Sequence, residues 1–163
     1  MALSSAQLYN LQGIRLPADA FVIIVRTEWN SDIVDLLETG CLKVLNDQNV
    51  KSKILTVPGV FEIGFAIKNY WDHQKEKDNK PLAFIALGCV LKGDTPHFEY
   101  VCNAVTDSIN QLNLLLPVPS IYGILTVNNR SQADERTGGA HGNKGEEAAI
   151  TALKMIELSQ SFK

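Results

Sequence analysis

The sequence predicts an α/β fold in which four parallel strands lie between two layers of helices, a three-layer αβα sandwich. Continuous apolar runs at residues 20–25 and 82–91 are typical of parallel strands covered on both faces. Segments with apolar residues at helical spacing follow the strands, so strands and helices alternate along the chain. Such alternation predicts right-handed crossover connections and helices on both faces of one sheet.

The first half of the chain contains two strand–helix units. A strand at 20–25 precedes a helix over 31–46, which Asn30 or Ser31 can cap. A second strand at 53–57 ends at a Pro-Gly pair and precedes a second helix. The apolar positions at helical spacing are Val34, Leu37, Cys41 and Leu45 in the first helix and Ile63, Ala66, Ile67, Tyr70 and Trp71 in the second.

The second half repeats this pattern. A strand at 82–91 leads into a helix, and a strand at 120–127 is followed, after a polar and glycine-rich stretch, by a last helix. The last helix should begin at Asn143, because Asn143 and Glu146 have the spacing of a capping box. The apolar positions of the third helix are Phe98, Val101, Val105, Ile109, Leu112 and Leu115.

The chain length and the first residues complete the expected organisation. The 163 residues suit a single domain spanning 1–163, which buries roughly 70% of the surface of its unfolded chain. Residues 1–17 belong to no strand–helix unit. We expect them to form an arm that can add an extra strand, on this chain or on a neighbouring subunit.

Composition and charge exclude several classes of protein. A net charge of −3 and a pI near 5.6 argue against a broad nucleic-acid surface, which needs clustered Lys and Arg. No apolar run approaches the roughly 20 residues of a membrane helix, and the opening residues lack the pattern of a signal peptide. We therefore expect a cytoplasmic protein with a small-molecule ligand. Cys41, Cys89 and Cys102 form no metal or redox motif and are expected to be buried thiols.

Residues able to do chemistry gather where the predicted strands end. In open α/β sheets, ligands bind beyond the carboxyl ends of the strands. The residues in these positions are Trp29 and Asn30 after the first strand, Gly59, Val60, Phe61 and Glu62 after the second, Leu91 to His97 after the third, and Thr126 to Asn129 after the fourth, with Arg136 and Lys144 further on. This grouping predicts one ligand site made from several loops.

The loop after the third strand has features of an anion site. Gly93, Asp94 and Thr95 precede a helix, whose N-terminal N–H groups and partial positive charge attract anions. Thr95 can equally be a plain N-cap, with Pro96 in the first helical position. Arg136 can bind phosphate through two parallel hydrogen bonds, although a lone arginine is more often a solvated surface charge.

The remaining candidate side chains also leave two interpretations open. His97 can transfer protons near neutral pH, or it can be a helix-start histidine bonded locally. Trp29 can stack on a planar ring or pack in the core, and Glu62 can accept hydrogen bonds from a ligand or favour a helix start. His73, at a polar helix end, and His141, in a glycine-rich loop, are interpreted as local structural histidines.

Five motifs occur in order between Ala20 and the C-terminus: WN, PGVFEI, GCVLKGDTPHFEYV, YGILTV and ERTGGAHGNKGEEAA. Together they resemble the lumazine synthase family. The resemblance implies a flavodoxin-like strand order and, in riboflavin biosynthesis, the condensation of 5-amino-6-(D-ribitylamino)uracil with 3,4-dihydroxy-2-butanone 4-phosphate. The product is 6,7-dimethyl-8-ribityllumazine, with release of phosphate and water. The resemblance implies neither a metal nor an organic cofactor.

The resemblance also implies a role for each matching residue. His97 would be catalytic. The pyrimidine and its ribityl chain would be bound by Trp29, Asn30, Val60, Phe61, Glu62, Val90, Leu91, Tyr122 and Lys144, and the phosphate by Gly93, Asp94, Thr95 and Arg136. In the family a neighbouring subunit supplies the positions of Tyr122 and Lys144. The implied assembly is a homo-oligomer built on pentamers (a pentamer, a decamer or a 60-subunit shell) with active sites between adjacent subunits. Riboflavin synthase is a further candidate partner.

Several positions depart from the usual family pattern. Gly64 stands where proline is common, Lys92 where arginine is common, and Ala140 and His141 where many members have Lys-Ala. The missing lysine at 140 removes one candidate phosphate contact. The alternative function is therefore a weakly active or non-catalytic paralogue that binds riboflavin or lumazine, or a structural shell protein. A flavodoxin-like electron carrier would need a phosphate-binding loop after the first strand, and RTEWN is not such a loop. A receiver domain would need an acidic cluster with an Asp at the end of a central strand, and the sequence shows none.

Overall fold

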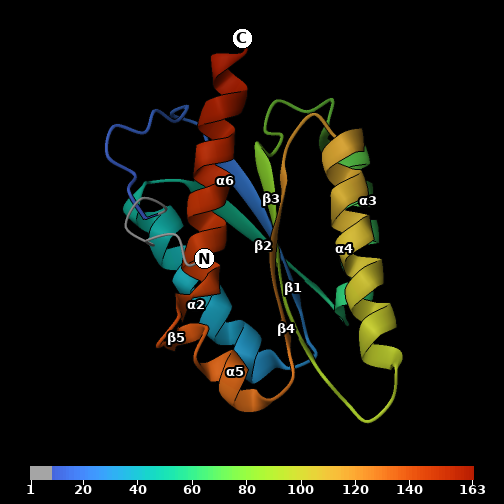
Figure 1. Cartoon of the computed structure of the whole chain (residues 1–163). Helices are drawn as coiled ribbons and strands as arrows, with labels where there is room; N and C mark the ends of the chain where they lie inside the picture. The colour runs from blue at the N-terminus through green and yellow to red at the C-terminus, as the bar shows by residue number, and fades with distance from the viewer. Residues whose placement is uncertain (1–8) are drawn as a thin grey trace.

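The computed structural model describes residues 9–163 and has a four-stranded parallel sheet at its centre (Figure 1). The strands lie in the order β2-β1-β3-β4, which is the flavodoxin-like order expected. Their bounds are β1 (Phe21–Thr27), β2 (Lys51–Val57), β3 (Ala83–Leu91) and β4 (Ser120–Val127). The chain passes from β1 to β2 on one side and then to β3 on the other, so the strand order reverses between β1 and β3.

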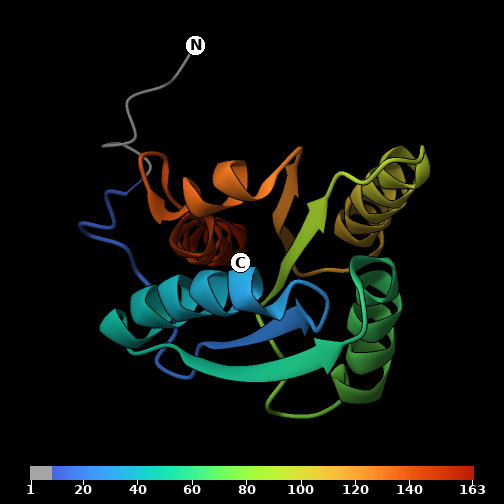
Figure 2. The same ribbon diagram turned by 90° about the horizontal axis from the view of Figure 1, so that it is seen from below.

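Helices cover both faces of this sheet, which confirms the three-layer architecture (Figure 2). Helices α2 (Ser31–Asp47) and α6 (Lys144–Ser161) pack on one face, and α3 (Ile63–Gln74) and α4 (His97–Leu115) on the other. The sequence patterns did not predict three short elements near the strand ends. These are the 3-10 turn η1 (Val60–Glu62), the helix α5 (Arg130–Asp134) and the antiparallel hairpin of β5 (Thr137–Gly139) and β6 (Gly142–Asn143).

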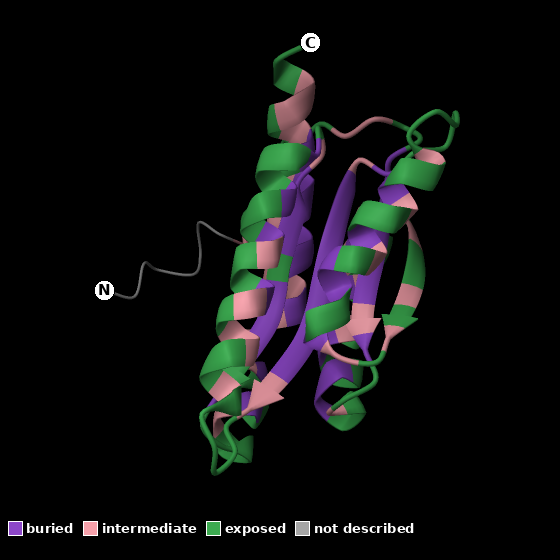
Figure 3. Ribbon diagram, turned by 90° about the vertical axis from the view of Figure 1, so that its right-hand side faces the viewer, coloured by how far each residue is buried: buried purple, intermediate pink, exposed green. Residues whose placement is uncertain are grey.

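The apolar core has two parts because side chains alternate across the central strands. In β1, Val22 and Ile24 face α2 and α6, whereas Ile23 and Val25 face α3 and α4, and all four are fully buried. Figure 3 shows the buried central strands in purple and the outward faces of the helices in green. By contrast, β2 is an edge strand, and Ile54 on it is 37% exposed.

Helices α2 and α6 approach each other closely at a glycine. A Cβ atom on Gly145 would overlap the carbonyl oxygen of Leu37 and lie 2.6 Å from its carbonyl carbon. The start of α6 is fixed by Asn143, whose side chain accepts hydrogen bonds from the backbone N–H groups of Gly145 (2.8 Å) and Glu146 (3.3 Å). The predicted N-cap is therefore confirmed. The Glu146 carboxylate pairs with Lys43 of α2 at 3.1 Å, which adds a contact between the two helices.

The described part of the N-terminal arm, residues 9–17, packs on its own chain and contains no strand. Leu11, Ile14 and Leu16 contact the core beneath α2 and α6, and the Tyr9 hydroxyl donates a hydrogen bond to Glu147 (3.1 Å). Burial, followed by this bond, raises the pKa of Tyr9 to about 12. Residues 1–8 lie outside the described residues, so contact of the arm with a neighbouring subunit stays a prediction.

Two expectations about burial were wrong. Leu115 ends α4 and is 68% exposed, because Leu116, just past the helix, takes the place against the core. Cys102 is partly exposed on α4, whereas Cys41 and Cys89 are buried as expected. Burial raises the pKa of the Cys41 thiol to about 12 and that of Cys89 to about 11. Within residues 9–163, none of the helices has both the length and the apolar composition needed to cross a membrane.

Candidate active site

The candidate site lies at the carboxyl edge of the sheet, where the loops after β1, β2 and β3 meet. This edge contains the point between β1 and β3 at which the strand order reverses, and ligands of open α/β sheets bind at such points. The Asn30 side-chain amide connects the two strands, because it donates to the carbonyl oxygen of Cys89 at 2.9 Å. Asn30 adopts a left-handed conformation (φ 56°), which turns the chain sharply from β1 into α2.

The first loop presents an aromatic ring to solvent. The Trp29 backbone N–H donates to the carbonyl oxygen of Pro58 at 3.1 Å, which joins the first loop to the second. The Trp29 side chain is 73% exposed. The backbone is thus fixed while the ring stays free to stack on a ligand, so Trp29 is not a core residue of the single chain.

The second loop places a carboxylate beside this ring. A Glu62 oxygen accepts a hydrogen bond from the Gly59 backbone N–H at 3.1 Å. A Cβ atom on Gly59 would lie 3.2 Å from that oxygen and 4.0 Å from Trp29 Cδ1, so both side chains border the same small space. Phe61 is 65% exposed, whereas Val60 is buried.

The third loop forms an exposed start to α4. Gly93, Asp94, Thr95 and His97 are all exposed, and the Thr95 hydroxyl accepts a hydrogen bond from the His97 backbone N–H at 3.4 Å. The structure begins α4 at His97 with Pro96 in the capping position, but Pro96 already has helical angles (φ −63°, ψ −2°). By its hydrogen bond to the His97 N–H, Thr95 makes the contact typical of an N-cap, which is one of the two interpretations that the sequence left open. Val90 and Leu91 end β3 and are half-buried.

The other predicted residues lie apart from these loops. Tyr122 of β4, Arg136 after α5 and Lys144 at the start of α6 line a groove of about 1200 Å³ along the outer edge of β4. Trp29, Glu62 and His97 are not among the residues that line this groove. Burial raises the pKa of Tyr122, whose hydroxyl lies 3.4 Å from the Thr106 hydroxyl. One chain therefore brings the predicted site residues together in two groups.

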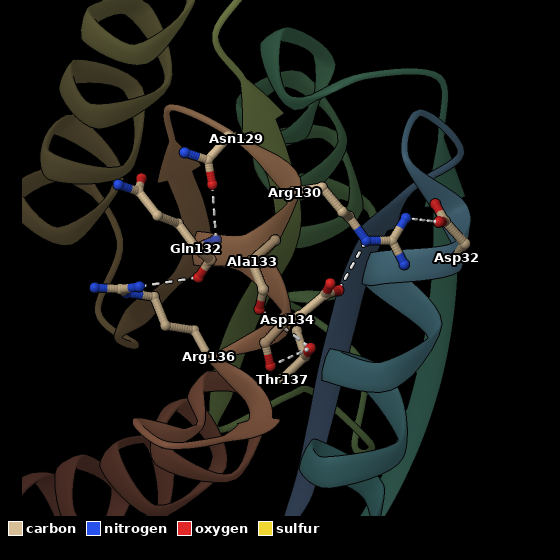
Figure 4. A network of polar contacts seen from close by, with 8 residues as sticks. All are labelled: Asp32, Asn129, Arg130, Gln132, Ala133, Asp134, Arg136 and Thr137. Atoms are coloured by element: carbon tan, nitrogen blue, oxygen red, sulfur yellow. Dashed lines mark hydrogen bonds and ion pairs between the residues drawn. The ribbon is translucent and has the colours of Figure 1, made fainter.

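Two arginines flank the short helix α5 and point to opposite sides: Arg130 begins the helix and Arg136 follows it (Figure 4). Arg136 donates to the Gln132 carbonyl oxygen at 2.9 Å, and its side chain extends away from α2. Arg130 pairs with Asp32 in the first turn of α2 and with Asp134 at 2.8 Å. The sequence patterns did not predict the ion pairs of Arg130. One signal for α5 was present: Asn129 can cap a helix three residues before Gln132, and in the structure its side chain accepts a hydrogen bond from the Gln132 backbone N–H at 3.0 Å.

The Asp32–Arg130 pair predicts a pH-dependent stability. The hydrogen bond from Arg130 holds the pKa of Asp32 below its ordinary value, so the pair stabilises the fold above about pH 4 and loses this effect as the pH falls through the lowered pKa. We expect Arg130→Met to lower the urea midpoint slightly at pH 7, because both side chains are exposed, and we expect this difference to shrink as the pH falls below about 4. Lys43→Met removes another exposed pair and serves as the control. A difference that persisted undiminished at low pH would contradict this assignment.

No resident metal is suggested by the side chains at either group. Within residues 9–163, His, Cys, Asp and Glu side chains do not gather in threes where a metal ion could be held. The groups present are an exposed aromatic ring, a carboxylate, a histidine, an exposed helix start and two cations. These suit the binding of a planar polar ring and an anion, with proton transfer by the histidine.

The fold and the two groups of residues define an α/β protein with a candidate ligand site at the carboxyl edge of a parallel sheet. Comparison with known proteins gives the family: residues 19–160 match the 6,7-dimethyl-8-ribityllumazine synthase family, and the chain belongs to it. The 6,7-dimethyl-8-ribityllumazine synthase of Parabacteroides distasonis is 42% identical over 154 residues, which cover 93% of each chain. That of Bacteroides fragilis is 45% identical over 142 residues, covering 85% of this chain and 96% of the relative. That of Porphyromonas gingivalis is 43% identical, with 93% of each chain covered.

Proposed function

We propose that this protein is a transferase of riboflavin biosynthesis that condenses 5-amino-6-(D-ribitylamino)uracil with 3,4-dihydroxy-2-butanone 4-phosphate to give 6,7-dimethyl-8-ribityllumazine. Membership of the family supports this activity. The proposal rests on the arrangement of three loops: the loops of Trp29 and Glu62 are joined by backbone and side-chain contacts, and the loop before His97 follows β3 at the same edge of the sheet, where the strand order reverses.

The first and second loops suit the uracil substrate. The exposed Trp29 ring offers an apolar face of about the right size for stacking on a pyrimidinedione. Asn30, Val90 and Leu91 border the same strand ends and offer backbone groups to the ring edge. Val60 and Phe61 would contact the ribityl chain through their backbones. Glu62 has a carboxylate oxygen bonded to Gly59 and a second oxygen able to accept from a ribityl hydroxyl.

The third loop suits the phosphate ester. Gly93, Asp94 and Thr95 lie before the first turn of α4, where backbone N–H groups and the helix dipole favour an anion. Arg136 would supply the positive charge, and its planar guanidinium can make two hydrogen bonds to phosphate oxygens. Holding both substrates in contact lowers the entropic part of the barrier.

His97 is placed to move protons between the two substrates. The substrate amine attacks the ketone, and loss of water gives an imine. A proton then leaves carbon as the C–O bond to phosphate breaks, and ring closure releases a second water. His97 lies two residues after Thr95 of the phosphate loop, so its imidazole can take the carbon proton and return protons to the departing oxygens.

The second group of residues suits a site completed by another copy of the chain. Tyr122, Arg136 and Lys144 line a groove along the outer edge of β4, which pairs only with β3 among the described strands. A neighbouring subunit seated there would bring its Trp29, Glu62 and His97 to these residues. We propose a cytoplasmic homo-oligomer built on pentamers, with active sites between adjacent subunits and riboflavin synthase as a candidate partner.

Mixed oligomers test whether neighbouring subunits share the site. We expect His97→Ala and Arg136→Met each to retain only a small but measurable fraction of the turnover when expressed alone. Co-expression of the two variants should restore turnover, because about a quarter of the interfaces in a randomly mixed ring pair an intact His97 with an intact Arg136. The same variants purified separately and mixed without reassembly are the control. Co-expressed protein no more active than the two variants alone would show that one chain supplies both residues.

A rate measurement separates the enzyme from the alternative function. The purified protein is mixed with both substrates, and lumazine absorbance is followed beside the uncatalysed reaction. A rate well above the uncatalysed one supports the enzyme. Binding of riboflavin or lumazine without acceleration would instead assign the protein as a non-catalytic paralogue.

A further inference from the structure

The hairpin of β5 and β6 brings His141 back to the end of α5. The His141 backbone N–H donates to the carbonyl oxygen of Glu135 at 2.8 Å, and the Lys144 N–H donates to that of Arg136 at 2.9 Å. The hairpin closes through Gly142, whose φ of 73° favours glycine. These backbone contacts return His141 to Glu135 and the start of α6 to Arg136, although the sequence suggested only a local structural histidine.

A single carboxylate oxygen lies between His141 and Arg136. Glu135 Oε2 is 3.6 Å from Arg136 Nη1 and also 3.6 Å from His141 Nε2. Arg136 Nη1 donates in addition to the Gln132 carbonyl oxygen, which fixes the orientation of the guanidinium. The carboxylate is therefore positioned to pair with either basic group, and its pairing decides how much of the Arg136 charge is neutralised.

The other nearby charges are already paired with different groups. Lys144 contacts Glu147 at 2.6 Å. Arg130 binds Asp32 and Asp134 on the opposite side of α5 from Arg136 (Figure 4). Among the ion pairs of the described residues, Glu135 takes part only in those with Arg136 and His141.

A carboxylate on Arg136 competes with a phosphate for the same donors. We propose that His141 is a positioning residue: it competes with Arg136 for the Glu135 carboxylate and so leaves more of the guanidinium charge for the substrate phosphate. This inference rests on the proposed function, in which Arg136 binds that phosphate. His141 stands where many family members have alanine, next to position 140, where the family lysine is missing. Arg136 is then the one cation proposed to bind the phosphate, and His141 supports it indirectly through Glu135.

Four variants test the role of His141 by steady-state kinetics. His141→Ala should raise the KM of the phosphate substrate about two- to fivefold, the range for one partly exposed ion pair, with kcat and the KM of the uracil substrate unchanged. His141→Lys should retain the original KM. In the Glu135→Gln background, His141→Ala should have no further effect, because no carboxylate remains to compete. An unchanged KM in His141→Ala, or the same rise with and without Glu135, would overturn the proposal.

Competitive inhibition by inorganic phosphate distinguishes a failure of this inference from a failure of the proposed function. Arg136→Met should weaken inhibition by phosphate strongly, His141→Ala slightly, and His73→Ala, a control histidine on α3, not at all. If Arg136→Met leaves inhibition unchanged, the phosphate site of the proposed function is wrong. If Arg136→Met weakens inhibition but the His141 variants do not, only the role of His141 is wrong.

Discussion

Replacing His97 by alanine should lower kcat about 100-fold, the lower end of the contribution of a positioned general acid–base group. The imidazole lies at the exposed first turn of α4, next to the loop proposed to hold the departing phosphate. Because its side chain is exposed in the chain, the fold should tolerate the substitution. The measurement is steady-state lumazine formation at saturating concentrations of both substrates.

A matched histidine controls for general effects of the substitution. His73 is exposed on α3, where its Nδ1 lies 2.8 Å from the Asn69 carbonyl oxygen, far along the chain from the phosphate loop. We expect His73→Ala to keep kcat and both KM values. Full turnover in His97→Ala would remove His97 from the mechanism and leave substrate positioning alone to explain the rate.

The largest effect on stability should come from Gly145→Ala. The new methyl group would overlap the backbone carbonyl of Leu37, and neither α2 nor α6 can move apart without separating buried side chains. Overpacking of this kind typically costs about 1–3 kcal/mol and occasionally more, and contact with rigid backbone places it at the upper end. We expect the free energy of unfolding to fall by about 3 kcal/mol, or roughly 6–12 °C in Tm for a chain of this length.

Urea unfolding and thermal melts measure this difference. Gly93→Ala is the control, because a Cβ atom at that position meets nothing within 4 Å. It should unfold at nearly the same urea concentration as the unmodified protein. Gly145→Ala with an unchanged midpoint would mean that α2 and α6 are not as closely packed as described.

The main architecture could be predicted because it depends on local periodicity. The strand expected at 120–127 matches β4, and that at 82–91 differs from β3 by one residue. Residues of α5 and the β5–β6 hairpin could not be found in this way, since α5 is too short to show a repeat. Its Ala133 is fully buried in the core beside α2 and α6, and the Thr137 hydroxyl donates a hydrogen bond to the Ala133 carbonyl oxygen.

The sequence predicts the location of the site better than the division of its residues into two separate groups on one chain. The rule that ligands bind beyond the carboxyl ends of parallel strands placed Trp29, Glu62 and His97 at one edge, and their loops lie there. Sequence spacing cannot show that Tyr122 lies along a strand edge in a groove with Arg136, because that depends on the packing of α6 beside β4. Likewise, the contact of Glu135 with His141 depends on the hairpin register.

Thermal stability and catalytic turnover should depend on different residues of this chain. Trp29 is 73% exposed and His97 also lies at the surface, whereas Gly145 is buried between two helices. Melting temperature and turnover should therefore vary independently among variants. A screen by melting temperature would detect substitutions that disturb the packing of the helices. Substitutions of the exposed loop residues that greatly lower turnover would keep the melting temperature of the unmodified protein.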